Sequence, residues 1–141
     1  MKKVCRSILS VAICLFLLLE LTSCGSNNSS KEKITINGES FSSDEFYNTL
    51  LNNEHKAKQY KGQEATVTGK ISKIEENFNQ TNLNHYFAAC ITIGYHWNFE
   101  VSLSALDDLE IGDTVTIKGK VSAILGSTLY CYDGNTILSK K

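Results

Sequence analysis

Two cysteines, Cys90 and Cys131, are the first residues to consider for chemistry, because each lies in a segment that alternates like a β-strand. A disulfide between them would close a loop of roughly 40 residues and stabilise the fold by a few kcal/mol. The alternative is a pair of buried free thiols that pack as small apolar side chains. An even number of cysteines in an exported domain permits the disulfide, and the sequence leaves both alternatives open.

A further cysteine, Cys24, follows a segment organised like a secretory signal. Three basic residues in the first six precede an apolar run at 8–19, which at roughly a dozen residues is too short to span a bilayer as a mature helix. The end of the segment, Leu21-Thr22-Ser23-Cys24, resembles the bacterial lipobox, whose cysteine receives a diacylglycerol thioether and then an acyl chain such as palmitate. We therefore predict a lipoprotein signal peptide at 1–23 and lipid attachment at Cys24. The alternative is an uncleaved anchor, or an ordinary signal peptide with an incidental cysteine.

A lipid anchor would fix both the location and the organisation of the chain. The protein would lie at the cell membrane or an outer membrane, exposed outside the cytoplasm. The Ser- and Asn-rich start of residues 24–42 predicts a flexible tether. Residues 43–141 then form the folded domain.

The histidines and carboxylates give no catalytic or metal-binding pattern. His55, His85 and His96 lie in separate segments, and no group of His, Cys, Asp and Glu has metal-ligand spacing. The sequence has no nucleophile–base arrangement, no glycine-rich phosphate loop and no paired carboxylate site. We expect no enzyme activity, no metal and no cofactor.

Aromatic side chains gather between residues 86 and 99. Tyr86, Tyr95 and Trp97 are the candidate ligand-binding face, because aromatic side chains on such strands can contact a sugar, a peptide or a protein. The alternative is that Phe87, Phe99 and also Trp97 belong to the core.

The charge distribution disfavours nucleic acid as the ligand of this face. No lysine or arginine occurs between Lys73 and Lys118, and without residues 1–23 the chain has a formal net charge of −3. Binding to a phosphate backbone requires basic side chains near the stacking aromatics.

One helix precedes the strands. Ser42 or Ser43 can cap it, and Phe46, Leu50, Ala57 and Tyr60 recur at helical spacing as its buried stripe. After Gly62 the sequence alternates with period two in five segments, separated by turn signals and by a polar stretch at 76–85 that we interpret as a loop. The five expected strands are 65–74, 86–93, 97–103, 115–124 and 128–138.

Two of these strands carry a glycine in their middle, Gly69 and Gly119, followed by an aliphatic residue out of register. A glycine inside a strand indicates a bulge or a sharp bend, which a small closed barrel requires. We therefore predict a mainly β domain: a five-stranded OB-fold barrel preceded by one N-terminal α-helix. An SH3-like barrel or an open meander is the alternative.

The motifs around these glycines resemble a known family. Tyr60-Lys61-Gly62, the strand Val67-Thr-Gly-Lys-Ile-Ser-Lys-Ile74 and the run Gly112-Asp-Thr-Val-Thr-Ile-Lys-Gly119 are similar to the tRNA_anti-like OB-fold family of small bacterial exported proteins and lipoproteins. The resemblance covers roughly residues 44–138 and implies the fold. It implies no catalytic residues, and a fold does not by itself determine function.

These observations predict a membrane-anchored lipoprotein whose non-catalytic OB-fold module binds a protein, peptide or glycan partner in the cell envelope. The alternatives are a nucleic-acid-binding OB domain and a purely structural stabiliser of an envelope complex.

Overall fold

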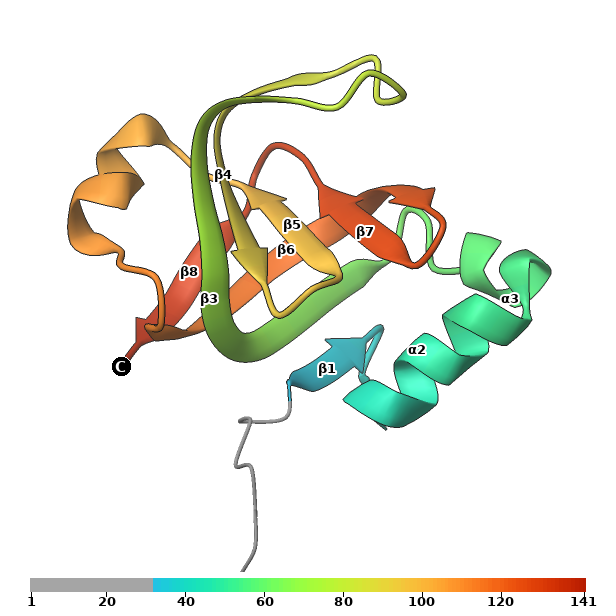
Figure 1. Cartoon of the computed structure of the whole chain (residues 1–141). Coiled ribbons are helices and arrows are strands. Elements are labelled where there is room, and N and C mark those ends of the chain that lie inside the picture. The colour runs from blue at the N-terminus through green and yellow to red at the C-terminus, as the bar shows by residue number, and fades with distance from the viewer. Residues whose placement is uncertain (1–31) are drawn as a thin grey trace, which may run out of the picture.

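The computed structural model describes residues 32–141 (Figure 1). The predicted signal peptide, Cys24 and the first part of the predicted tether lie outside the described residues. Within residues 32–141, no helix has the length and apolar character needed to cross a membrane. The elements are β1 (Lys33–Ile36), β2 (Glu39–Ser42), α2 (Ser43–Asn52), α3 (Glu54–Lys58), β3 (Glu64–Asn79), β4 (Tyr86–Ile93), β5 (Trp97–Glu100), the 3-10 helix η2 (Leu103–Asp108), β6 (Thr114–Leu125), β7 (Thr128–Cys131) and β8 (Thr136–Lys140).

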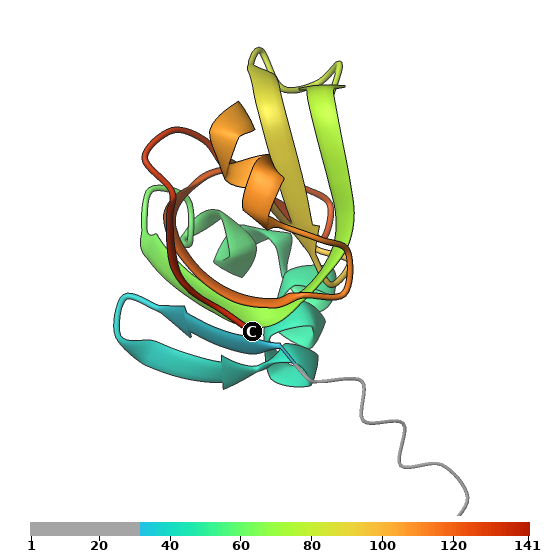
Figure 2. The same ribbon diagram turned by 90° about the vertical axis from the view of Figure 1, so that its left-hand side faces the viewer.

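The described strands form one sheet in the order β2-β1-β3-β4-β5-β7-β6-β8. Because β3 also pairs with β6, the strands β3, β4, β5, β7 and β6 pair in a closed cycle. The β5–β7 pair is parallel, and the other pairs are antiparallel. Figure 2 shows the sheet curving round on itself, with the β1–β2 hairpin on its outside. The closed cycle excludes the open meander.

The fold is mainly β and OB-like, as predicted, but the sheet has eight strands rather than five. Two of the additional strands, β1 and β2, are only four residues long, so their alternation is too short to distinguish from a loop in the sequence. The third arises because the predicted strand at 128–138 is divided into two strands, β7 and β8. The predicted tether at 24–42 is accordingly wrong for its last part, where β1 and β2 form a hairpin. Its turn is Asn37-Gly38, and both residues have the positive φ that a tight hairpin requires.

The mid-strand glycines lie where the two long strands bend. In each case the pairing register shifts two residues further on, between Ile71 and Lys73 in β3 and between Val121 and Ala123 in β6. A side chain at Gly69 would clash, since its Cβ would lie 2.6 Å from Cγ2 of Ile93. The first half of β3 therefore pairs with β6, and the second half continues around the bend to pair with β4.

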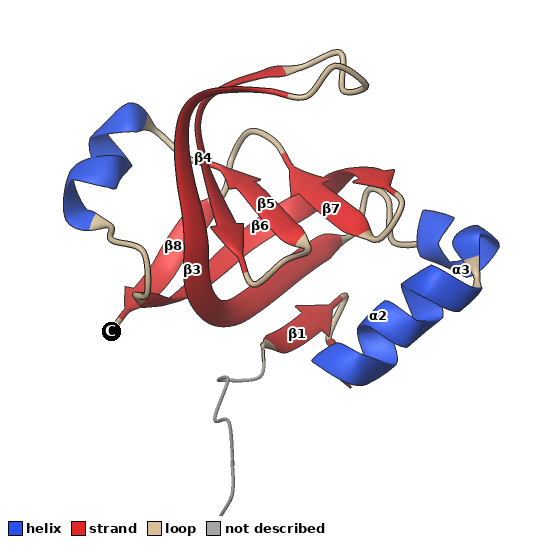
Figure 3. Cartoon of the chain, viewed as in Figure 1, coloured by secondary structure: helices blue, strands red, loops and turns tan. Residues whose placement is uncertain are grey.

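The helical segment packs against one side of the barrel (Figure 3). Phe46 of α2 is fully buried, and its ring lies 5.7 Å from that of Trp97 at an interplanar angle of 21°. Ser42 and Glu45 form a capping box at the start of α2. The predicted single helix is divided in two at Asn53, which has φ −149° and caps α3 with its side chain.

The predicted loop at 76–85 is shorter than expected. Strand β3 continues to Asn79, and the β3–β4 hairpin projects beyond the barrel (Figure 1). Glu76 and Asn77 are both exposed, whereas Phe78 packs against Phe87 and Tyr130. Phe78 is the one apolar residue among the last five residues of β3, so this extension has too little alternation in hydrophobicity to be recognised as a strand.

Candidate functional site

Of the two alternatives for Cys90 and Cys131, the structure shows buried free thiols rather than a disulfide. Cys90 lies on β4 opposite Glu100 of β5, whereas Cys131 lies on β7 opposite Phe99 of β5. Strand β5 separates them, so their backbones are two strand spacings apart, about 10 Å. A disulfide requires Cα atoms within about 7 Å. Burial raises the pKa of Cys90 to about 12 and also raises that of Cys131.

The three predicted ligand-face aromatics do not form one surface. Trp97 is fully buried and stacks between Phe46 and Phe99, so its assignment to the ligand face was wrong. Tyr86 and Tyr95 are exposed, but Tyr86 begins β4 and Tyr95 lies in the turn after it. The two tyrosines are therefore at opposite ends of the strand.

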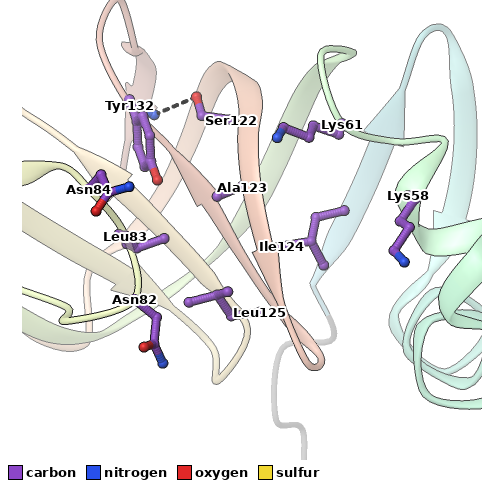
Figure 4. A pocket seen from close by; sticks show the side chains of 10 residues that line it. All are labelled: Lys58, Lys61, Asn82, Leu83, Asn84, Ser122, Ala123, Ile124, Leu125 and Tyr132. Atoms are coloured by element: carbon purple, nitrogen blue, oxygen red, sulfur yellow. Dashed lines mark hydrogen bonds between the residues drawn. The ribbon is translucent and has the colours of Figure 1, made fainter.

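A pocket with a volume of about 590 Å³ lies instead beside the β6–β7 hairpin (Figure 4). Its walls come from four segments: α3 and the turn after it, the β3–β4 loop, the second half of β6, and the residue that follows β7. In the view of Figure 4 the β6 side chains lie between the lysines and the loop residues. The lining residues are Lys58, Lys61, Asn82, Leu83, Asn84, Ser122, Ala123, Ile124, Leu125 and Tyr132.

The lining combines an apolar surface with cations and amides. Leu83, Ile124 and Leu125 supply aliphatic area, and Asn82 and Asn84 supply exposed amide groups. Among the described residues, no acidic side chain lines this pocket. A pocket of this composition suits a ligand with an apolar group beside a carboxylate or another hydrogen-bond acceptor.

The two lysines give the pocket its positive charge. Lys58 lies on α3 and forms an exposed i,i+4 pair with Glu54, with 3.6 Å between Nζ and Oε1. Lys61 is exposed in the turn that leads to β3. An exposed pair of this kind is weak, so the Lys58 side chain can exchange Glu54 for a ligand carboxylate at little cost.

A small aromatic cluster lies beneath the β3–β4 loop next to the pocket. Tyr132 stacks on His85 with ring centroids 4.2 Å apart, and Phe87 meets both rings edge-on. The backbone N–H of Tyr132 donates to Oγ of Ser122, which fixes the chain after β7 against β6. This packing holds the pocket wall in place. The His85 ring also covers one face of the Tyr132 ring.

The sequence did not predict this pocket, because its cations lie outside the strands at 74–117 that were expected to bind the ligand. Lys58 and Lys61 precede β3 and reach the pocket from the helical segment. The only available signal was the cluster of lysines at the end of the predicted helix. The closure of the sheet determines which strands lie next to the end of the helical segment, and the sequence does not show this.

The closure also assembles a group that spacing could not reveal. His85, Glu100 and Asp133 each contribute one potential ligand atom, and these atoms lie within 4.8 Å of one another. His85 Nε2 and Glu100 Oε2 are 2.8 Å apart. The fold therefore brings potential metal ligands together although their spacing in the sequence is not that of a metal-binding motif.

Comparisons with known proteins point to a family. The tRNA_anti-like family model matches residues 1–131. No curated protein matches the chain, and no solved structure matches it.

Proposed function

The chain belongs to the tRNA_anti-like family, and from this premise we propose that it is a lipid-anchored, non-catalytic OB-fold module that binds a partner in the cell envelope. In this proposal the closed cycle β3-β4-β5-β7-β6 is the five-stranded OB barrel, with β1, β2 and β8 as additions to it. The partner is a protein or peptide segment that presents an apolar side chain beside a carboxylate. A glycan with acidic groups has the same recognition chemistry.

The pocket beside the β6–β7 hairpin is the single observation that carries this proposal. In OB folds, the loop between the first two strands and the loop between the last two flank the usual ligand site. The β3–β4 loop supplies Asn82 and Leu83, and the β6–β7 hairpin supplies Leu125. The lysines and the absence of lining carboxylates favour an acidic partner.

A charge reversal in the pocket tests the proposed binding. Lys58→Glu should reduce recovery of the partner with the anchored protein, because it places an anion in the pocket. Lys56→Glu is the matched control, since Lys56 is an exposed residue of the same helix that does not line the pocket. The measurement is quantitative co-purification from crosslinked membranes. Equal recovery with the two variants would contradict the assignment of the pocket.

The anchor is proposed on the sequence of residues 1–24. Cys24 receives the lipid in this account, and the domain lies outside the cytoplasm at the cell membrane or an outer membrane. Replacing Cys24 with alanine should release the protein from the membrane fraction and abolish incorporation of labelled palmitate. Unchanged partitioning would contradict the lipid anchor without affecting the pocket.

Nucleic acid is the second candidate ligand, because Lys58 and Lys61 supply cations that the strands at 74–117 lack. Against it, Tyr132 is the single aromatic residue among the described residues that line the pocket, and His85 covers one face of its ring, so at most one base could stack there. Filter binding at low salt distinguishes the candidates. Affinity for an oligonucleotide that falls steeply with added salt, and that is lost in Lys58→Glu, would favour nucleic acid.

A further inference from the structure

A group of three side chains outside the pocket has the composition of a metal site. His85 lies just before β4, Glu100 ends β5, and Asp133 follows β7, and their ligand atoms lie within 4.8 Å of one another. We propose that His85, Glu100 and Asp133 bind a divalent first-row transition-metal ion, with Zn²⁺ as the best fit. This site adjoins the proposed partner pocket through Tyr132, on which His85 stacks, but none of its three ligands lines that pocket.

The ligand set favours zinc over the common hard cations. Zinc accepts imidazole nitrogen and carboxylate oxygen together, at about 2.0–2.2 Å, and a site of three protein ligands leaves a further position for water. Calcium and magnesium prefer oxygen ligands alone. One imidazole with two carboxylates therefore selects for zinc or a neighbouring transition metal.

The charge of the cluster is unbalanced in its present form. Within residues 32–141, no ion pair joins a lysine or arginine to Glu100 or Asp133, and the pair with His85 is the only one that Glu100 makes. With a neutral imidazole the group carries two negative charges, and with a protonated imidazole it still carries one. A divalent cation would neutralise the cluster.

Hydrogen bonds connect the backbone segments that contain Glu100 and Asp133, and ring stacking positions His85. Nδ2 of Asn135 donates to the backbone carbonyl oxygens of Glu100 at 2.8 Å and Cys131 at 2.9 Å, and also to that of Tyr132. These bonds connect the end of β5 to the loop after β7, which carries Asp133. The His85 ring is held by stacking on Tyr132. Fixing the ligands before the metal arrives reduces the cost of ordering them.

Metal binding requires the three ligand atoms to adjust from their present separations, which are at most 4.8 Å. His85 Nε2 and Glu100 Oε2 are 2.8 Å apart as a hydrogen-bonded pair, whereas two ligand atoms on a tetrahedral zinc lie roughly 3.3 Å apart. The pair would thus separate by about half an ångström on metal binding. A cleft of about 390 Å³ lined by Glu100, Ser102 and Asp133 adjoins the cluster and gives access to water or another ligand.

Isothermal titration of the metal-free full chain with Zn²⁺ tests this proposal. The protein should be purified in detergent without a histidine tag and freed of metal with a chelator. We expect one tight zinc ion per chain, and we expect Asp133→Asn to weaken its binding at least tenfold. Asp133 is exposed, so this variant leaves the core unchanged. Asp107→Asn is the matched control, because Asp107 is an exposed residue of η2 outside the cluster.

A second variant and a second probe keep the test independent of folding. His85→Gln should also weaken zinc binding, whereas His55→Gln, at an exposed position of α3, should leave it unchanged. Co²⁺ should give the intense visible absorption of a tetrahedral site in the wild-type protein, and Asp133→Asn should lose it. Failure of the wild type to bind Zn²⁺ at 100 µM would overturn the proposal, as would equal zinc affinities in Asp133→Asn and Asp107→Asn.

Discussion

The contact between α2 and the barrel gives the sharpest test of the fold. Phe46 is fully buried, and its ring packs against Phe41, Tyr47, Tyr60 and Trp97. Replacing Phe46 with alanine removes the largest buried side chain of the helix and leaves a cavity. Substitutions of this kind cost about 3–5 kcal/mol in protein cores.

That loss is large compared with the total stability of a small domain, which is about 5–15 kcal/mol. The assay is equilibrium unfolding in urea, followed by tryptophan fluorescence. The sequence has a single tryptophan, and because Trp97 is buried against Phe46, its emission reports directly on this contact.

The matched control is Leu51→Ala on the same helix. Leu51 is 64% exposed, so its truncation should change the free energy of unfolding by less than about 0.5 kcal/mol. The reasoning would be refuted if Phe46→Ala lost under 1 kcal/mol, or no more than Leu51→Ala. Either result would mean that α2 does not pack on the barrel as described.

Three further predictions concern the cap, the thiols and a mid-strand glycine. Ser42→Ala should destabilise the protein by about 1 kcal/mol in urea unfolding, because it removes the side-chain acceptor at the start of α2. Iodoacetamide at neutral pH should leave Cys90 and Cys131 unmodified in the folded chain, because both thiols are buried and have raised pKa values. In urea it should alkylate both, as measured by mass spectrometry. A disulfide would block alkylation in urea as well. Gly119→Ala should lower the free energy of unfolding by about 1–3 kcal/mol. The new Cβ would lie 2.0 Å from Oδ1 of Asn135 and would displace this side chain, which donates to three backbone carbonyls. A Tm equal to that of the wild type would contradict this prediction.

Local sequence patterns predicted the central elements of this fold well. The alternation around Gly69 and Gly119 indicated two bent strands, and the pairing register of each strand shifts between its glycine and the out-of-register aliphatic residue. Helical spacing indicated a buried stripe of Phe46, Leu50, Ala57 and Tyr60; the first three are buried, and Tyr60 is half-buried. These features depend on residues close in the sequence, which a periodicity argument can read.

The features that were missed depend on contacts between distant residues. The predicted strand at 128–138 is divided into β7 and β8, which pair with different parts of β6. Trp97 could be assigned to the core or to the surface until the position of Phe46 was known. The lysines of the pocket and the partners of His85 come together only when the sheet closes, so no spacing in the sequence could reveal them.

The central claim is that a partner binds in the pocket beside the β6–β7 hairpin. Its most direct test is a photo-crosslinking amino acid placed in cells at Asn82, an exposed residue of the pocket, and at Asn52, an exposed residue at the end of α2. The account predicts a discrete protease-sensitive adduct from position 82, none from position 52, and loss of that adduct in Lys58→Glu. Equal adducts from both positions, or a nuclease-sensitive adduct at position 82, would contradict it.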